Sequence, residues 1–427
     1  MQSDGSIVAA GERGARARRP AILEGFARRM VLARLEGLHY GRLVVEDGPE
    51  RIAFGEDIED AELRATVRVH DRRFYADLAL GGSVGAGESY MAGCWSADDL
   101  TTLMRLMVRN RDVMEGMESG LARAANPVRR TLHYLNRNTR TGSRRNISAH
   151  YDLGNDFFEL VLDRSMMYSC AIFERAEASL DEAAAAKVDR ICRKLELKPT
   201  DHLVEIGTGW GGFAIHAARN YGCRVTTTTI SHRQRDFAIA RIAAAGLADR
   251  VTVLLKDYRD LDGQYDKAVS IEMIEAVGHH FLDAYFRKCG ELLKPDGMML
   301  LQAITIADQH YASALRSVDF IKKYIFPGSF IPSVTAIADS ITRASDLRLF
   351  HLEDLTPNYA ETLKHWRLNT FRNLVRVKAL GYPDEFIRMW EYYLCYCEGG
   401  FRERYIGDVQ MLLVKPLCRR TPILPRL

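Results

Sequence analysis

A glycine-rich turn is the segment whose residue types and spacing most directly suggest chemistry. Gly207, Gly209 and Gly211 follow a short apolar strand-like run and precede a helix-like one. Such glycines let the backbone turn sharply and approach a ligand beside the positive end of a helix. The spacing is Gly-x-Gly-x-Gly, whereas dinucleotide folds show Gly-x-Gly-x-x-Gly, and the acidic Glu205 precedes the turn. The pattern therefore favours S-adenosylmethionine over a nicotinamide, with a ligand-free strand–helix turn as the alternative.

Two further segments fit an adenosyl-binding site. Thr229 ends the next strand-like run and Gln234 follows on the next helix, while Asp257 and Tyr258 follow the third run. Asp257 can accept a hydrogen bond from an adenine amino group, and the ring of Tyr258 can pack against the base. A solvated loop aspartate explains Asp257 equally well.

Other reactive side chains carry weaker signals. Cys170 invites a nucleophile hypothesis but has no activating partner that the sequence reveals. His150, His279 and His280 lack the spacing of a metal-binding motif, and the eight cysteines are scattered, with one close pair in C-x-C spacing. We expect neither a metal site nor a disulfide framework.

Alternating elements are expected to position the glycine turn. From residue 201 onward, apolar strand-like runs alternate with helix-like segments, which is typical of a parallel sheet with helices on both faces. The expected strands are residues 202–207, 224–229, 251–255, 266–272 and 297–306, and the expected helices are residues 211–221, 232–245 and 281–293. This indicates an α/β fold.

The N-terminal part predicts a small α+β domain. Residues 18–43 alternate arginines with apolar side chains, which suits either a helix packed on a core or a helix lying on an anionic bilayer. Residues 44–51 and 65–80 are expected to form strands, and residues 81–93 are glycine-rich. Residues 123–146 are polar and rich in arginine. We therefore place a domain at 1–122, a basic linker at 123–146 and a second domain at 147–427.

Composition limits the protein class. The chain has 427 residues, 47% hydrophobic content and a formal net charge of +3, which is small for a nucleic-acid-binding protein of this size. Residues 1–12 lack the apolar centre of a secretory signal, and no apolar run approaches the roughly 18 residues of a membrane-spanning helix. We expect a cytoplasmic protein that is soluble or peripherally associated with a membrane, and no nucleic-acid partner.

Four segments taken in order resemble the cyclopropane-fatty-acyl-phospholipid synthase family. They are residues 147–158 with 167–171, the glycine turn, residues 270–279 and residues 323–328. The resemblance is dense over the last two-thirds of the chain and extends loosely to residues 85–91. It implies a Rossmann-like class I methyltransferase sheet, with the N-terminal domain engaging lipid and forming a homodimer.

The resemblance also implies roles for individual residues. Tyr168 and Ser169 match positions that close over the methionine end of S-adenosylmethionine, and the adenosyl site matches Gly207, Gly209, Thr229, Gln234 and Tyr258. A bicarbonate ion is expected at Cys170, Glu275, Gln302, Ile304 and Tyr359. At Gln302 the sequence departs from the family, whose better-known cyclopropane synthases have histidine there.

The implied activity is transfer of a methyl(ene) carbon from S-adenosylmethionine to the double bond of an unsaturated phospholipid acyl chain, giving a cyclopropane. Bicarbonate, oriented by Glu275, would take the proton during ring closure, and Tyr324, Phe326 or Tyr359 could stabilise the carbocation. Gln302 keeps open a methylene-branched, methyl-branched or furan-precursor chain, and a silent lipid-binding relative is a further alternative. The enzyme is expected to associate transiently with the inner face of the membrane.

Overall fold

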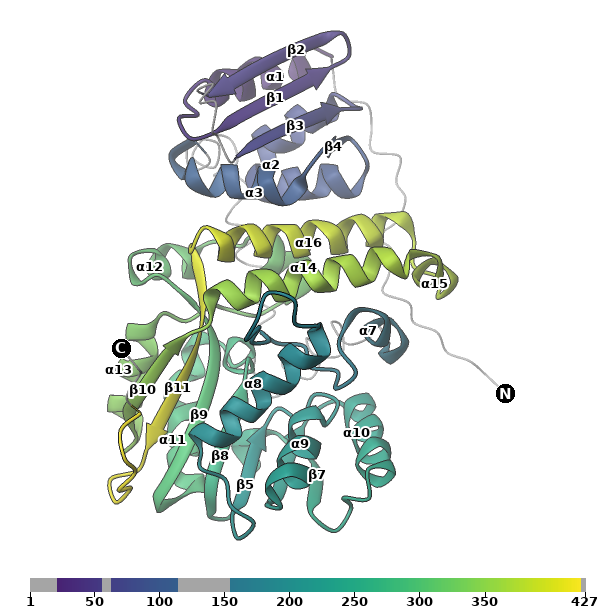
Figure 1. Ribbon diagram of the computed structural model, residues 1–427. Coiled ribbons are helices and arrows are strands. Elements are labelled where there is room, and N and C mark those ends of the chain that lie inside the picture. Colours follow the sequence, from purple (N-terminus) through teal and green to yellow (C-terminus); the bar gives the residue numbers. More distant parts are fainter. Residues whose placement is uncertain (1–20, 56–62, 114–153, 424–427) are drawn as a thin grey trace. The chain divides into compact units, whose positions relative to one another are not determined.

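The computed structural model describes residues 21–55, 63–113 and 154–423 (Figure 1). They fall into two compact units, one ending at residue 113 and one starting at residue 154, which are described separately. The arginines at positions 13–19, the expected linker at 123–146, and residues 147–153 with His150 lie outside the described residues.

The N-terminal unit is a four-stranded sheet with helices. The strand order is β2-β1-β3-β4, with β1 parallel to β3 and antiparallel to β2. Its elements are α1 (Ala21–Leu35), β1 (Arg42–Asp47), β2 (Glu50–Gly55), β3 (Arg64–Val69), α2 (Arg73–Met91), β4 (Trp95–Ala97) and α3 (Leu100–Arg109). The expected small α+β arrangement is confirmed for these residues.

Helix α1 packs on the core of this unit. Ala27, Val31 and Leu35 are buried at a spacing of four residues, which places them on one helical face. Arg28 donates to Asp47 at 2.7 Å and to Glu50 at 2.7 Å. The interpretation of this segment as a core-packing helix therefore fits better, and the helix is shorter than the predicted 18–43.

The prediction for residues 65–80 and the glycine-rich segment was wrong. A strand covers only Arg64–Val69, and Arg73–Met91 forms helix α2, which is kinked at Gly82 (φ 57°, ψ −144°). A Cβ atom on Gly85 would lie 1.9 Å from the backbone oxygen of Asp77. The glycines therefore allow two helical stretches to meet closely, which the glycine content alone did not indicate.

The second unit contains a seven-stranded sheet in the order β10-β11-β9-β8-β5-β6-β7. Strands β5 to β9 are parallel to one another, and β11 is antiparallel to both β9 and β10. The strands are β5 (His202–Ile206), β6 (Arg224–Thr229), β7 (Val251–Leu255), β8 (Tyr265–Ile271), β9 (Leu293–Ile306), β10 (Arg348–Asp354) and β11 (Ile406–Val414). The chain order reverses between β5 and β8, which is where ligands bind in open α/β sheets.

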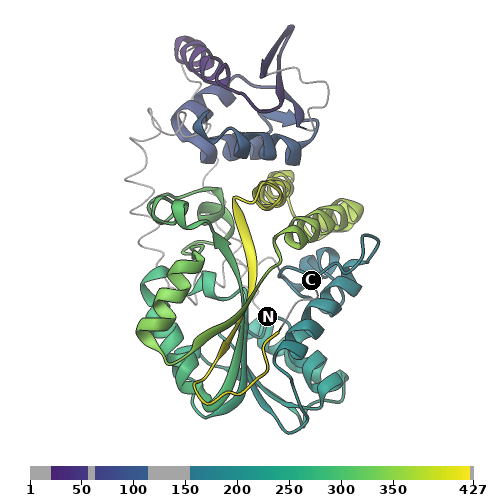
Figure 2. The ribbon, with the colours of Figure 1, turned by 60° about the vertical axis from the view of Figure 1, so that its left-hand side comes forward.

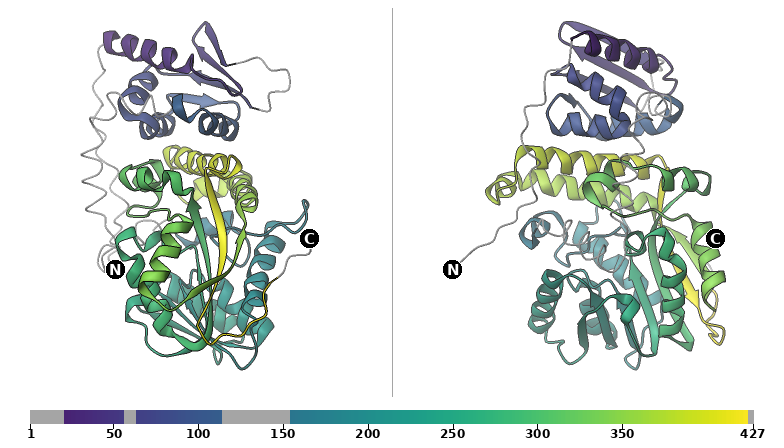
Figure 3. Two further views of the ribbon diagram at one scale, coloured as in Figure 1. Left: turned by 90° about the vertical axis from the view of Figure 1, so that its left-hand side faces the viewer. Right: turned by 180° about the vertical axis from the view of Figure 1, so that it is seen from behind.

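Helices cover both faces of this sheet, as Figure 2 shows. The helices of the unit are α7 (Asn155–Val161), α8 (Leu180–Lys194), α9 (Gly212–Tyr221), α10 (His232–Ala244), α11 (Leu282–Leu292), α12 (Asp308–Arg316), α13 (Val334–Ala344), α14 (Thr356–Arg372), α15 (Leu374–Ala379) and α16 (Asp384–Arg402). Helices α14 and α16 lie side by side beyond the end of the sheet (Figures 1 and 3).

Strand β9 shows how the two faces divide. Met299, Leu301 and Ala303 join one buried cluster with α11 and α13, whereas Met298 and Leu300 join another with α8, α9 and α10. Successive side chains of a strand point to opposite faces of the sheet. A continuous apolar strand therefore contributes side chains to the hydrophobic core on each face. The Rossmann-like class I methyltransferase sheet expected from the resemblance is confirmed.

The predicted elements of this unit match the structure to within a few residues at each end. Short helical turns at Tyr258–Asp260, Ile274–Ala276, His279–Phe281 and Ile321–Ile325 were not predicted. Neither were α8 nor any element after Ile306. Within the described residues, none of the helices combines the length and apolar character needed to cross a membrane.

The close crossing in α2 makes Gly85 sensitive to substitution. Gly85→Ala should destabilise the N-terminal unit by about 1–3 kcal/mol because its methyl group meets the Asp77 carbonyl. Gly25→Ala on α1 is the matched control. Its methyl group meets nothing within 4 Å, so it should be neutral or stabilising by roughly 1 kcal/mol. Thermal and urea unfolding of both variants would check this, and an unchanged midpoint for Gly85→Ala would contradict it.

Candidate active site

The glycine turn lies at the carboxyl end of β5 and opens helix α9. Gly207, Gly209 and Gly211 have φ values of 104°, 52° and 83°, which glycine adopts without strain. The N–H of Gly207 donates to the backbone oxygen of Thr228 at 3.1 Å, which ties the turn to β6. A Cβ atom on Gly209 would meet nothing within 4 Å, so the turn leaves open space for a ligand.

Glu205 is buried one residue before the end of β5. Its Oε2 atom has no hydrogen-bond partner among the described residues, and burial raises its pKa to about 8. A buried carboxylate with one unpartnered oxygen is stabilised by a cationic ligand. Together with the open turn, Glu205 fits the methionine-derived cation of S-adenosylmethionine.

The predicted adenosyl residues follow β6 and β7. Thr229 donates to the amide oxygen of Gln234 at 3.0 Å, and both side chains are buried. Asp257 instead forms an ion pair with Arg259 at 2.6 Å, a contact that the sequence analysis did not predict. The ring of Tyr258 lies 5.5 Å from that of Tyr285, edge to face. These positions share the carboxyl edge of the sheet with the glycine turn.

Tyr168 and Ser169 lie in the segment before helix α8. The Tyr168 hydroxyl is 3.0 Å from that of Tyr393, and its ring is 5.0 Å from Trp366. Ser169 accepts a hydrogen bond from the ammonium of Lys187 at 2.8 Å. Lys187 is fully buried, and burial lowers its pKa. The segment is thus joined to the helices that enclose the sheet edge.

Glu272, which the sequence analysis did not select, accepts hydrogen bonds from three predicted residues. Its Oε1 accepts from the N–H of Cys170 at 2.7 Å and from the amide of Gln302 at 2.8 Å. Its Oε2 accepts from the hydroxyl of Tyr359 at 2.6 Å. Burial is the largest cause of its raised pKa. The predicted site therefore converges on a carboxylate of the chain itself.

Two more carboxylates lie nearby. Glu275 accepts a hydrogen bond from the N–H of Ile304 at 2.6 Å, and burial followed by repulsion from Glu272 raises its pKa to about 8. Asp408 on β11 pairs in register with Ile304, and burial together with repulsion from Glu272 raises its pKa well above the usual value. Both Asp408 oxygens lack a hydrogen-bond partner within the part of the chain that the structure describes. Burial and mutual repulsion therefore favour the protonated forms of these carboxyl groups, and a cationic ligand would favour their ionised forms.

A chain of amides sets the orientation of Gln302. Its oxygen accepts from the amide of Gln410 at 3.0 Å, and the oxygen of Gln410 accepts from Lys194 at 2.8 Å. Lys194 is also paired with Glu353 at 2.6 Å. Because its oxygen is used in this way, Gln302 presents its NH₂ group to Glu272.

The bicarbonate ion implied by the resemblance does not fit this set of donors. The donors of Cys170, Gln302 and Tyr359 point to Glu272, and the N–H of Ile304 points to Glu275. The resemblance had paired Tyr359 with Glu275 through the ion. The predicted residues do meet in one place, but side-chain carboxylates take the hydrogen bonds, so no step through bicarbonate is derived.

Cys170 is positioned by its backbone. Its thiol is fully buried, and burial raises its pKa well above the usual value, which disfavours a thiolate nucleophile. No group of three or more His, Cys, Asp or Glu side chains that could hold a metal ion occurs among the described residues.

Aromatic rings pack around Tyr359, which donates to Glu272. Tyr359 stacks on Phe401 at 4.3 Å and meets Trp366 edge to face at 6.2 Å. Phe326 lies 6.3 Å from Tyr168. Tyr324 packs against Phe320 at 5.1 Å, and Lys323 lies 5.0 Å from its ring centre. Of the three rings proposed for carbocation stabilisation, Tyr359 has the direct contact with Glu272.

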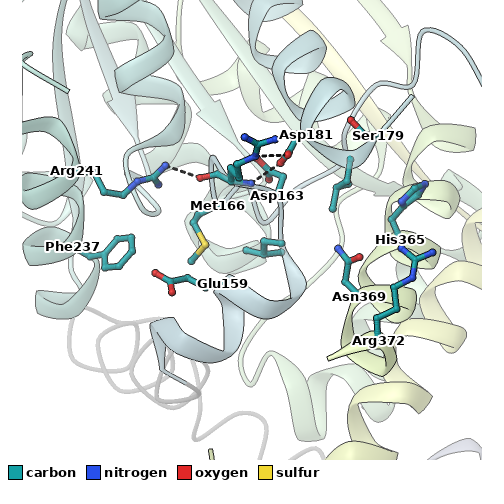
Figure 4. Close-up of a pocket in the computed structure, with 13 residues that line it drawn as sticks. Glu159, Asp163, Met166, Ser179, Asp181, Phe237, Arg241, His365, Asn369 and Arg372 are labelled. Atoms are coloured by element: carbon teal, nitrogen blue, oxygen red, sulfur yellow. Dashed lines mark hydrogen bonds and ion pairs between the residues drawn. The ribbon is translucent and has the colours of Figure 1, made fainter. Parts of the chain in front are cut away.

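A pocket of about 590 Å³ lies apart from these residues (Figure 4). Asp163, Arg164, Asp181, Arg241 and Arg372 are among its lining residues, and the lining includes none of the predicted site residues. Arg164 pairs with Asp181, and Arg241 donates to backbone oxygens of the segment 164–165. These contacts hold the segment that precedes Tyr168 against α8 and α10.

Three residues of the site were missed in the sequence. Glu272 stands three positions before Glu275, and sequence spacing alone does not show which carboxylate meets the donors. Asp408 interrupts the apolar strand run 406–414, a signal that could have been noticed. Lys187 lies on α8, where nothing in the local sequence distinguishes it from a surface lysine.

Comparison with known proteins places this arrangement in a family. The model of the mycolic acid cyclopropane synthetase family matches residues 138–411. Tuberculostearic acid methyltransferase of Mycobacterium tuberculosis is 40% identical over 352 residues, covering 78% of this chain and 79% of the relative. Cyclopropane-fatty-acyl-phospholipid synthase of Escherichia coli is 38% identical over 349 residues, covering 81% and 86%.

A solved structure agrees with these relatives. A mycolic acid cyclopropane synthase in complex with SAH and CTAB matches with a TM-score of 0.59 and 33% identity, covering 64% of this chain and 98% of that one. With the open glycine turn and the buried Glu205 at the edge of the sheet, these matches show that the chain belongs to the mycolic acid cyclopropane synthetase family of S-adenosylmethionine-dependent methyltransferases.

Proposed function

We propose that this enzyme transfers a methyl carbon from S-adenosylmethionine to the double bond of an unsaturated phospholipid acyl chain. The observation that carries the proposal is a buried carboxylate, Glu272, held by three donors among aromatic rings beside the glycine turn. An alkene is a weak nucleophile, so its methylation depends on alignment with the methyl donor and on excluding water from the resulting cation. A buried, aromatic-lined site with a fixed base meets these needs.

The residues for cofactor binding are proposed from their places at the sheet edge. Gly207, Gly209 and Gly211 would admit the cofactor, and Glu205 would pair with its methionine ammonium. Thr229, Gln234, Asp257 and Tyr258 would line the adenosyl group, and Tyr168 and Ser169 would close over the methionine end. When bound, S-adenosylmethionine supplies a methyl group activated by a positively charged sulfur.

The charge of the site suits both a sulfonium and a carbocation. Glu205, Glu272 and Asp408 interact with the ammonium of Lys187, and Glu275 is repelled by Glu272. Burial lowers the pKa of Lys187, and the charges of Glu272 and Asp408 raise it. Electron-rich faces of Tyr359 and Trp366 add favourable interactions with a cation. A protein that only binds lipid does not need a cluster of carboxyl groups that can pair with a cation. This cluster therefore disfavours the alternative of a lipid-binding relative without catalytic activity.

A cyclopropane is the product that we propose first. Ring closure requires a base that takes a proton from the transferred methyl group before the cation rearranges, and the three hydrogen bonds hold Glu272 ready for this step. The Escherichia coli relative that is 38% identical is named as a cyclopropane-fatty-acyl-phospholipid synthase. Phospholipid as the acyl carrier is part of the same proposal.

A methylene-branched or methyl-branched chain is the second candidate. Gln302 stands where the resemblance expects a histidine, and a neutral amide does not carry a proton as an imidazole does. Slower proton removal would give a hydride shift time to occur before the proton is lost. The relative that is 40% identical is named tuberculostearic acid methyltransferase.

Phospholipid as substrate places the enzyme at a membrane surface. The N-terminal unit exposes Phe26 and Tyr40, with 52% and 57% of their surface accessible, beside the arginine-bearing helix α1. We propose transient contact with the inner face of the membrane through these residues. Homodimer formation stays a prediction from the family resemblance.

Glu205→Gln tests the proposed cofactor site. The variant should bind S-adenosylmethionine roughly 10–100-fold more weakly, because it loses a charged hydrogen bond to the ammonium. Without cofactor, the raised pKa means that burial of ionised Glu205 costs stability as the pH rises from about 4.5 through about 8. Glu205→Gln removes this cost, so its stability relative to wild type should increase over this pH range.

Calorimetric titration and unfolding at several pH values would measure both effects. Glu291→Gln on α11 is the matched control because its side chain is 55% exposed, and it should change neither quantity. Unaltered cofactor affinity in Glu205→Gln would refute the proposed ammonium site.

Mass spectrometry of acyl chains tests the activity itself. In a host with monounsaturated phospholipids and no cyclopropane synthase of its own, expression with methyl-labelled methionine should add one labelled CH₂ unit per modified chain. Resistance to mild hydrogenation would identify a cyclopropane, and saturation of the product would identify a methylene branch. Glu205→Gln, expressed at the same level, should give far less product.

Purified enzyme and vesicles separate the acceptor classes. With methyl-labelled S-adenosylmethionine, vesicles of phosphatidylglycerol and phosphatidylethanolamine with cis-monounsaturated chains should become labelled. Vesicles with saturated chains should not. Labelling of free unsaturated fatty acid in place of vesicle lipid would contradict the choice of phospholipid.

A further inference from the structure

The carboxylate of Glu272 has one acceptor position open. A carboxylate offers about four lone-pair positions, two on each oxygen. The N–H of Cys170 and the amide of Gln302 occupy those of Oε1, and the hydroxyl of Tyr359 occupies one on Oε2. The second position of Oε2 has no partner among the described residues, so this atom can accept a proton.

The backbone at Glu272 is held in an unusual conformation. Its φ is 47°, in the left-handed region that side-chain-bearing residues rarely adopt and that costs about 1–3 kcal/mol. Its N–H donates to the backbone oxygen of Gln302 at 2.8 Å, which holds the turn after β8 against β9. The conformation brings the carboxylate to the three donors, and glycine would adopt it without strain.

The surroundings keep this carboxylate dry and basic. Glu272 lies near Asp408 and Glu275, whose negative charges favour its protonated form, while Lys187 and the three donors favour ionisation. Burial is the largest influence and raises its pKa. A hydrogen-bonded carboxylate that is more basic than one in water suits proton transfer from carbon.

We infer that Glu272 is the catalytic base and that its carboxylate takes the place of the free bicarbonate expected from the resemblance. This inference rests on the proposed alkene methylation. The donors expected for the ion are occupied by a side chain that the enzyme always carries, so turnover does not depend on dissolved bicarbonate.

The step balances without a further reactant. After methyl transfer, one C–H bond of the new methyl group breaks and its proton passes to Oε2 of Glu272. The electron pair of that bond forms the third C–C bond of the cyclopropane, or the C=C bond of a methylene branch if a hydride has shifted first. The proton then leaves to solvent, which restores the carboxylate.

A comparison of two substitutions at Glu272 tests the inference. Glu272→Gly suits the left-handed backbone, removes the base and frees the three donors, so an added small anion can enter. Glu272→Gln keeps the size of the side chain but fills the space with an amide, so an anion has no room. Both should lower kcat by about 100-fold or more, in line with loss of a general base.

The assay uses purified full-length enzyme, monounsaturated vesicles and labelled S-adenosylmethionine in buffer freed of carbon dioxide. Wild-type activity should be unchanged by bicarbonate. Formate or bicarbonate should raise the activity of Glu272→Gly at least tenfold and leave that of Glu272→Gln unchanged. Cofactor titration and thermal unfolding should show that both variants are folded and bind S-adenosylmethionine.

Each contrary result has a distinct meaning. Wild-type enzyme that stops without bicarbonate, Glu272→Gly that is fully active without an anion, or folded Glu272→Gly that no anion rescues would each overturn the inference. Wild-type enzyme that labels no unsaturated lipid under any condition would instead overturn the proposed function.

Discussion

Burying a carboxylate costs several kcal/mol unless a cation or a set of hydrogen-bond donors accompanies it, and four carboxyl groups gather at the carboxyl edge of the large sheet. Glu205, Glu272 and Asp408 interact with Lys187, and Glu275 is repelled by Glu272, so carboxyl groups outnumber the nearby ammonium. The raised pKa values of these groups express this imbalance. A site of this kind gains most from a positively charged ligand, and a sulfonium cofactor with an ammonium group supplies two positive charges.

The sheet supplies the precision that such a site needs. Gln302 and Gln410 face each other in the register of β9 and β11, and this pairing directs the Gln302 amide toward Glu272. Tyr359 reaches the same carboxylate from α14. Gln302 lies on a strand that is paired on both sides, and Tyr359 lies on a helix, so regular structure positions two of the three donors. The acidic edge is therefore rigid where its geometry matters.

Much of the second unit could be predicted from its sequence because each strand and helix has its own periodicity. The limits of β6 and β7 match the prediction, and the glycine turn lies where Gly207 to Gly211 indicated. The glycine-rich helix α2 was missed because composition does not reveal that Gly85 crosses the Asp77 carbonyl. The choice between Glu272 and Glu275 depended on a backbone φ angle, and the role of Asp408 on pairing between distant strands. Neither the φ angle nor the strand pairing can be obtained from the spacing of residues in the sequence.

The position of strand β11 determines which parts of the sheet can form while the chain is still being synthesised. It is the last strand of the sheet along the chain, yet it lies between β9 and β10, and its Ile406 pairs with Ile306 of β9. Until the ribosome has released this strand, β10 has no partner that joins it to β9, and Gln302 has no Gln410 to orient it. Pairing of segments so far apart is slow compared with local folding. A nascent chain can therefore form its glycine turn long before β11 arrives to orient Gln302 toward Glu272.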